Sequence, residues 1–136
     1  MAKNQTLYVG QKAFIRRDDE LLLLIDPQFG LDLPGGRMQE GEKDLKTSIH
    51  REIEEETGLV IKIGKPIATW TWQIKAEPHP VFLVGYDCKY ISGEVKLSSE
   101  HSEFHWVTKN NYKDVTEKYK EENPEISEAL DEYFGR

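Results

Sequence analysis

The sequence predicts a single α/β domain of 136 residues, in which strands are combined with two amphipathic helices. A helical pattern with a clear beginning and end occupies residues 44–58. Apolar and alternating segments, which are typical of strands, lie on both sides of it. A second helical pattern over residues 123–134 has apolar residues three and four positions apart. The resulting order is strands, helix, strands, helix.

The central helix is predicted to begin after Asp44, a good N-cap residue, and to end at Gly58, which favours a helix stop. Its apolar residues recur every four positions and are Leu45, Ile49 and Ile53. Residues at this spacing share one side of a helix, so they predict a buried stripe that packs against the sheet.

Four glutamates on this helix differ in their position relative to the stripe. Glu54 lies opposite it, whereas Glu52 and Glu56 fall within or beside it and Glu55 lies on its flank. Carboxylates crowded on a partly buried face repel one another and lose hydration, and a divalent cation relieves both costs. The alternative is a solvated acidic face, which predicts glutamates opposite the stripe. The placement of Glu52 and Glu56 therefore favours a metal site.

Residues 36–59 resemble the signature of the Nudix hydrolases, in which Gly-x5-Glu-x7 precedes Arg-Glu-apolar-x-Glu-Glu-x-Gly-apolar. Gly36, five residues and Glu42 match the first part, and the run from Arg51 to Leu59 matches the second. Eight residues separate Glu42 from Arg51, where the family usually has seven. The extra residue most simply lengthens the loop before the helix and leaves the helical glutamates intact.

The resemblance implies an α/β/α sandwich with a mixed central β-sheet, spanning residues 1–136 as one MutT-like domain. It also implies Mg²⁺ as the cofactor, with Mn²⁺ able to substitute. The implied metal ligands are the Gly36 carbonyl and the carboxylates of Glu52, Glu55, Glu56 and Glu100. The implied catalytic residues are the same four glutamates and Arg51. Arg51 is expected to hold a glutamate through a bidentate pair, and Glu42 to support the metal loop.

Two acids precede a predicted strand at residues 104–107, in a stretch similar to the one that brings a fourth glutamate to the metals of Nudix enzymes. Glu100 fits that position best and Glu103 is the second choice. Glu100 would then be a metal ligand or the general base. The alternative is two solvated loop acids. His101 and His105 are expected to be exposed, with substrate contact as their other role.

The predicted substrate contacts are Trp70, Trp72 and Arg37. The two tryptophans share one face of an alternating strand at residues 67–74 and are candidates for stacking on a nucleobase. Ordinary core packing is the alternative for both rings.

The implied reaction is hydrolysis of the pyrophosphate linkage in a nucleoside diphosphate joined to a group X. Its products are a nucleoside monophosphate and X-phosphate, or pyrophosphate when the substrate is a triphosphate. Sequence patterns linked to NADH, ADP-ribose and dinucleoside polyphosphates are not found, which favours a nucleoside triphosphate or a small nucleotide sugar. The longer loop favours one alternative, a nucleotide-binding or sensor module with weak or no hydrolysis. A plain acidic scaffold for a protein partner is another.

The formal net charge of −7 argues against duplex nucleic acid or an anionic membrane as the main partner. A phosphorylated ligand remains compatible if metal ions supply the countercharge. The single cysteine, Cys88, excludes an internal disulfide and suits a reducing compartment. The sequence has no signal-peptide pattern at residues 1–10. We therefore expect a cytoplasmic protein, monomeric or homodimeric, that acts on a small nucleotide.

Overall fold

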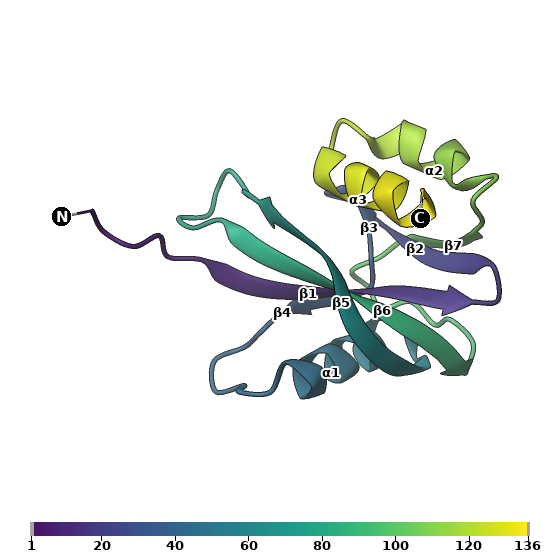
Figure 1. Cartoon of the computed structure of the whole chain (residues 1–136), viewed down its shortest axis with the longest axis horizontal. Coiled ribbons are helices and arrows are strands. Elements are labelled where there is room, and N and C mark those ends of the chain that lie inside the picture. The colour runs from purple at the N-terminus through teal and green to yellow at the C-terminus, as the bar shows by residue number, and fades with distance from the viewer. Residues whose placement is uncertain (1, 136) are drawn as a thin grey trace.

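A mixed sheet of seven strands lies at the centre of the computed structural model, which describes residues 2–135. Helix α1 covers one face of the sheet, and helices α2 and α3 cover the other (Figure 1). In chain order the elements are β1 (Tyr8–Arg17), β2 (Glu20–Asp26), β3 (Gly30–Asp32), β4 (Gly35–Arg37), α1 (Leu45–Thr57), β5 (Val60–Trp72), β6 (Val81–Ser92), β7 (Glu103–Val107), α2 (Tyr112–Tyr119) and α3 (Pro124–Phe134). This arrangement confirms the predicted α/β/α sandwich.

Strand β1 connects the parts of the sheet. It pairs in parallel with β6 along most of its length, and the strand order is β3-β2-β1-β6-β5, with β7 paired to β2. The other edge of β1 forms two short antiparallel pairings, one with β2 and one with β4. The end of β1 forms a hairpin with β2, and residues 10–12 pair with the three residues of β4. The glycine pair at the start of β4 is therefore attached to the middle of the sheet.

Strand β2 is buried on both faces, as its continuous apolar sequence predicts. Leu21, Leu23 and Ile25 pack in the core under α2 and α3, whereas Leu22 and Leu24 pack in the core under α1. This alternation follows from the two-residue period of a strand. One strand thus contributes to both hydrophobic layers.

Helix α1 has the predicted ends. The Asp44 side chain accepts a hydrogen bond from the N–H of Lys46, and Gly58 adopts the left-handed conformation with φ 72°. Ile49 and Ile53 are fully buried. The prediction for Leu45 is wrong, because its side chain is 38% exposed. Leu45 is the first helical residue, and side chains on a helix point back toward its N-terminus, so Leu45 does not extend the buried stripe formed by Ile49 and Ile53.

Strand β5 begins at Val60, well before the strand expected at residues 67–74. It is one continuous strand with irregular pairing to β6 on both sides of Pro66. Proline has no N–H to donate to a sheet ladder, and an edge strand can accommodate it through a bulge. Since β5 is the edge of this sheet, the strand continues past the proline.

Helix α3 begins at Pro124, directly after Asn123, as predicted. Asn123 does not cap the helix with its side chain. The Asn123 amide instead donates to the carbonyl oxygen of Leu31 at 3.2 Å. Asn123 therefore joins α3 to β3 through a contact between distant parts of the chain.

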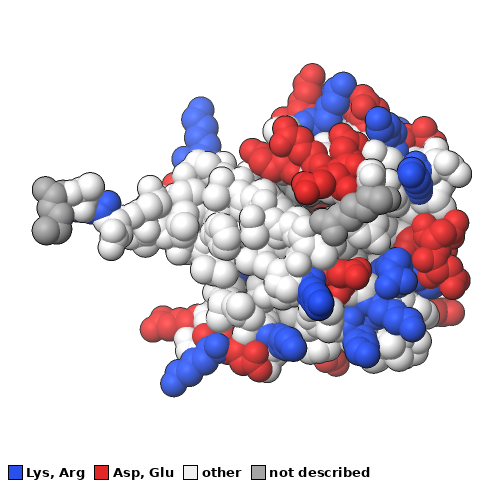
Figure 2. All heavy atoms as spheres, in the orientation of Figure 1, with Lys and Arg blue, Asp and Glu red and all other residues white. Residues whose placement is uncertain are grey.

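Charge is unevenly distributed over the face of the molecule seen in Figure 2. Acidic side chains gather over α2 and α3, while the projecting end formed by β1, β5 and β6 is mostly uncharged (Figures 1 and 2). Within residues 2–135, no helix is long and apolar enough to cross a membrane.

Candidate metal and substrate site

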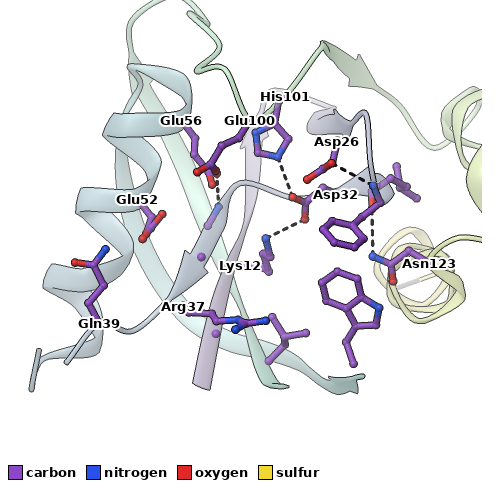
Figure 3. A pocket seen from close by; sticks show the side chains of 17 residues that line it. Lys12, Asp26, Asp32, Arg37, Gln39, Glu52, Glu56, Glu100, His101 and Asn123 are labelled. Carbon is purple, nitrogen blue, oxygen red and sulfur yellow. Dashed lines mark hydrogen bonds and ion pairs between the residues drawn. The ribbon is translucent and has the colours of Figure 1, made fainter. Parts of the chain in front are cut away.

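A cavity of about 330 Å³ lies between α1, β1, β3 and β4 and the segment that precedes β7 (Figure 3). Its acidic end contains Glu52 and Glu56 from α1 and Glu100 from the segment before β7. Its apolar end contains Phe29 and Trp72. The fold thus brings carboxylates and aromatic rings from distant parts of the sequence into one cavity.

Glu56 is the most buried carboxylate at the acidic end, with 4% of the residue exposed. Its Oε2 atom accepts a hydrogen bond of 2.9 Å from the backbone N–H of Gly35. Burial raises the pKa of Glu56 to about 7, although the nearby Lys12 ammonium and the Gly35 hydrogen bond oppose this shift. The carboxylate is therefore held in place, but its negative charge is poorly compensated.

Glu52 lies one turn before Glu56 and packs against Gly36. A Cβ atom on Gly36 would come within 2.6 Å of Glu52 Oε2, so a larger residue would displace this carboxylate. Burial raises the pKa of Glu52, while Arg51 opposes the shift with an ion pair of 3.0 Å. The Gly36 backbone and the Glu52 carboxylate are consequently neighbours at the acidic end.

Glu100 approaches Glu56 from the segment before β7. One carboxylate oxygen of each residue and one ring nitrogen of His101 all lie within 4.8 Å of one another. Glu103 is placed differently, within β7, where it contacts His105 at 3.4 Å. Of the two acids considered from the sequence, the structure brings Glu100 to the cavity.

Glu55 lies at the surface, where it shares Arg51 with Glu52. Its side chain is 58% exposed and forms an ion pair with Arg51 at 3.2 Å. Glu55 is not among the residues that line the cavity. The prediction that Glu55 binds metal therefore requires a rotation of its side chain away from Arg51.

Arg51 also fixes the loop that contains the extra residue. Its guanidinium donates to both carboxylate oxygens of Glu42, at 3.3 and 3.0 Å. Glu42 in turn accepts from the backbone N–H of Gln39 at 2.6 Å. The hydrogen bond with Arg51 lowers the pKa of Glu42. Glu42 is thus tied to α1 despite the longer loop.

A second charged cluster, which we call the Lys12–Asp32–His101 chain, forms the floor of the cavity. Asp32 binds Lys12 Nζ through Oδ1 and His101 Nε2 through Oδ2, each at 2.9 Å. Burial alone would raise the pKa of Asp32, but these two partners hold it below its usual value. The same pairing raises the pKa values of Lys12 and His101 against the opposing effect of burial.

Sequence reasoning did not find this chain, and the expectation that His101 is exposed is wrong, since the residue is 6% exposed. Its hydrogen bond to Asp32 compensates the loss of water. A weak signal was present at Lys12, because a lysine at an inward position of a buried strand needs a partner. The identity of that partner depends on how β1, β3 and the segment before β7 meet.

The acidic end fits a hard divalent cation. Three carboxylates and the backbone of Gly35 and Gly36 line this cavity, and burial raises the pKa values of Glu52 and Glu56. Arg51 is shared between Glu52 and two further acids, and Lys12 is paired with Asp32. Mg²⁺ and Mn²⁺ take oxygen ligands of this type.

The three predicted substrate contacts have different surroundings. Trp72 lines the cavity and meets Phe29 edge-to-face, with ring centroids 5.2 Å apart. Trp70 packs against Phe14 beneath α3 and does not line the cavity. Arg37 lines the cavity, but its guanidinium is held by both carboxylate oxygens of Glu77, at 2.6 and 2.7 Å.

The model of the NUDIX domain family matches residues 8–130. The chain belongs to this family. Nudix hydrolase YvcI of Bacillus subtilis (strain 168) is 30% identical over 105 residues, which cover 74% of this chain and 66%, just under two thirds, of that protein.

Two solved structures illustrate the similarity of this NUDIX chain to known folds. A MutT protein from Methanosarcina mazei Go1 is 28% identical with a TM-score of 0.70, covering 90% of this chain and 99% of that one. An ADP-ribose pyrophosphatase from Streptococcus suis 89-1591 is 25% identical with a TM-score of 0.61, covering 77% of this chain and 76% of that one. These matches confirm the Nudix-type fold and the MutT-like resemblance.

The raised pKa of Glu56 makes the stability of the metal-free protein depend on pH. Because the pKa rises to about 7 on folding, the folded state binds more protons than the unfolded state at mildly acidic pH. The contribution of Glu56 to the stability of the folded state is fully present below the pKa of this group in the unfolded chain, and it is lost as pH rises through about 7. Between pH 4 and pH 8, we expect the titration of Glu56 to lower the free energy of unfolding by about 3 kcal/mol.

Urea denaturation in EDTA at several values between pH 4 and pH 8 measures this dependence. The Glu56→Gln variant should lack this part of the decrease, while the matched Glu54→Gln variant, altered on the exposed side of α1, should retain it. The same pH dependence in the wild type and Glu56→Gln would show that Glu56 does not carry the effect.

Proposed function

We propose that the protein is a metal-dependent pyrophosphohydrolase. It cleaves a nucleoside diphosphate linked to a group X into a nucleoside monophosphate and X-phosphate, or releases pyrophosphate from a nucleoside triphosphate. The observation that supports this most is the meeting of Glu52, Glu56 and Glu100 beside Gly36 in one cavity. Membership of the NUDIX family agrees with it.

In this proposal Glu52, Glu56, Glu100 and the Gly36 carbonyl hold Mg²⁺ or Mn²⁺. When bound, the cation neutralises phosphate oxygens and lowers the pKa of a water molecule. Gly35 orients Glu56 through its N–H, and Arg51 orients Glu52 while keeping Glu42 against the helix. These contacts hold the acidic groups in position before substrate arrives, which reduces the cost of organising the site.

Besides its place among the ligands, Glu100 is suited to accept a proton. It is exposed, in contrast to the buried Glu56, and its backbone N–H is bound to Ser98 Oγ at 3.3 Å. An exposed carboxylate on a segment outside the helix can move relative to Glu52 and Glu56. Glu100 is therefore our choice for the group that accepts a proton from the attacking water.

The apolar end of the cavity suits a nucleobase. Trp72 and Phe29 offer aromatic surface, and Gly10 and Leu83 also line the cavity. The similarity to an ADP-ribose pyrophosphatase supports a nucleotide that contains a pyrophosphate linkage. The sequence lacks the proline spacing linked to ADP-ribose, so we favour a nucleoside triphosphate or a small nucleotide sugar.

Replacing Glu56 by Gln should lower metal-dependent hydrolysis by a factor of at least about 100, because it removes the charge of the most enclosed carboxylate. Release of phosphate or pyrophosphate from triphosphates, nucleotide sugars and ADP-ribose in the presence of Mg²⁺ measures the effect. EDTA should abolish turnover.

The matched control is Glu54→Gln, which should retain wild-type turnover. Full activity of Glu56→Gln would contradict the proposal. A wild-type protein that binds nucleotide and Mg²⁺ but turns over none of the panel would instead support the sensor alternative.

The Glu55→Gln variant tests the remaining predicted ligand: a loss as large as that of Glu56→Gln would mean that Glu55 turns toward the metal.

Replacing Trp72 by Ala should raise the KM for the nucleotide about tenfold and change kcat much less, because stacking on one base contributes about 1–3 kcal/mol. Steady-state kinetics with the best substrate of the panel measures both constants. The Phe104→Ala variant removes an exposed aromatic ring from β7 and should leave KM unchanged. An unchanged KM in Trp72→Ala would contradict the assignment of a base to this end of the cavity.

A further inference from the structure

His101 has a buried ring nitrogen for which the fold provides no partner. The residue lies in the segment between β6 and β7 and is 6% exposed. Its Nε2 atom is 2.9 Å from Asp32 Oδ2. Its Nδ1 atom is buried and has no hydrogen-bond partner among the residues that the structure describes. A buried polar atom without a partner is costly, so Nδ1 is a candidate for binding a ligand.

The Asp32 contact determines which nitrogen of the neutral ring carries the proton. Asp32 forms an ion pair with Lys12 Nζ through Oδ1 at 2.9 Å, and its Oδ2 atom faces His101 Nε2. An ionised carboxylate only accepts hydrogen bonds, so Nε2 must donate. Nδ1 of the neutral imidazole then carries a lone pair, which is suited to a cation or to a hydrogen-bond donor.

The immediate neighbours of this imidazole are carboxylates. A ring nitrogen of His101 and one carboxylate oxygen each from Glu56 and Glu100 lie within 4.8 Å of one another. In Figure 3 the ring lies beside Glu100, with its other side turned to Asp32. Ligand atoms bound to one cation at about 2.1 Å lie at most about 4.2 Å apart, so a small movement of these side chains would allow them to share an ion.

The support behind the ring also matches a metal site. Histidines that bind metals usually donate their second N–H to a carboxylate, which fixes the orientation of the ring. Asp32 has this relation to His101, and Lys12 holds Asp32 from the other side. The Lys12–Asp32–His101 chain therefore fixes the ring through Nε2 and leaves its second nitrogen, Nδ1, available to a ligand.

We propose that His101 Nδ1 is a nitrogen ligand in the metal site, beside the carboxylates of Glu56 and Glu100. Imidazole favours transition metals, whereas Mg²⁺ prefers oxygen ligands. The site then binds Mn²⁺ or Co²⁺ more tightly relative to Mg²⁺ than carboxylates alone would. This inference rests on the proposed metal site and adds to it a ligand of a different chemical type.

Pulsed EPR of the full chain loaded with one equivalent of Mn²⁺ tests the inference directly, because it detects nitrogen nuclei bound to the ion. We expect ¹⁴N coupling in the wild type, replaced by ¹⁵N coupling when the protein contains ¹⁵N-labelled histidine. The His101→Gln variant should lose the coupling. The matched His105→Gln variant, altered at a histidine on β7, should keep it.

Calorimetric titrations with Mn²⁺ and Mg²⁺ give a second readout. His101→Gln should lower the affinity for Mn²⁺ about tenfold and the affinity for Mg²⁺ much less. Bound Mn²⁺ without histidine coupling in the wild type would overturn the nitrogen ligand and leave the carboxylate site standing. A wild-type protein that binds neither ion would overturn the proposed function as well. The labelled wild-type spectrum decides the question even if His101→Gln fails to fold.

Discussion

The hydrogen bond from the Gly35 backbone to the buried carboxylate of Glu56 is the contact on which the candidate site depends. It joins α1 to β4, and β4 is joined to β1 because Gly35 pairs with Lys12. Gly35 has φ 140°, and a Cβ atom at this position would collide with the carbonyl oxygen of Gln11. A residue with a side chain would thus separate β4 from β1 and withdraw the N–H from Glu56.

The distribution of charge explains why Glu56, although bound by the Gly35 N–H, would be stabilised by a metal cation. Arg51 is shared among Glu42, Glu52 and Glu55, and Lys12 is bound to Asp32. The side chains of Arg51 and Lys12 therefore already have acidic partners, while burial keeps the pKa of Glu56 at about 7. Removing carboxylates from water without full compensation is costly, and the structure concentrates that cost at one end of the cavity. A divalent ion would offset it.

Local features of the site could be predicted from the sequence, because helix ends and helical faces depend on nearby residues. Asp44, Gly58 and the inward position of Glu56 follow from capping preferences and from the helical period. The Lys12–Asp32–His101 chain could not be predicted, because its members come from three segments that meet only in the folded sheet.

Residues that look equivalent in the sequence can also differ in the structure because of their tertiary contacts. Trp70 and Trp72 share a strand face and look equivalent in the sequence, but α3 covers Trp70 and leaves Trp72 at the cavity. Glu55 belongs to the matched signature, yet its ion pair with Arg51 keeps it outside the cavity. Tertiary contacts thus decide which members of a sequence pattern can act together.

The most direct test of the central claim is an anomalous diffraction map from crystals soaked in Mn²⁺. The account predicts a peak at coordination distance, about 2.2 Å, from the carboxylate oxygens of Glu52 or Glu56 and from the Gly36 carbonyl. A well-ordered map without a peak between α1 and the Gly36 backbone would contradict it.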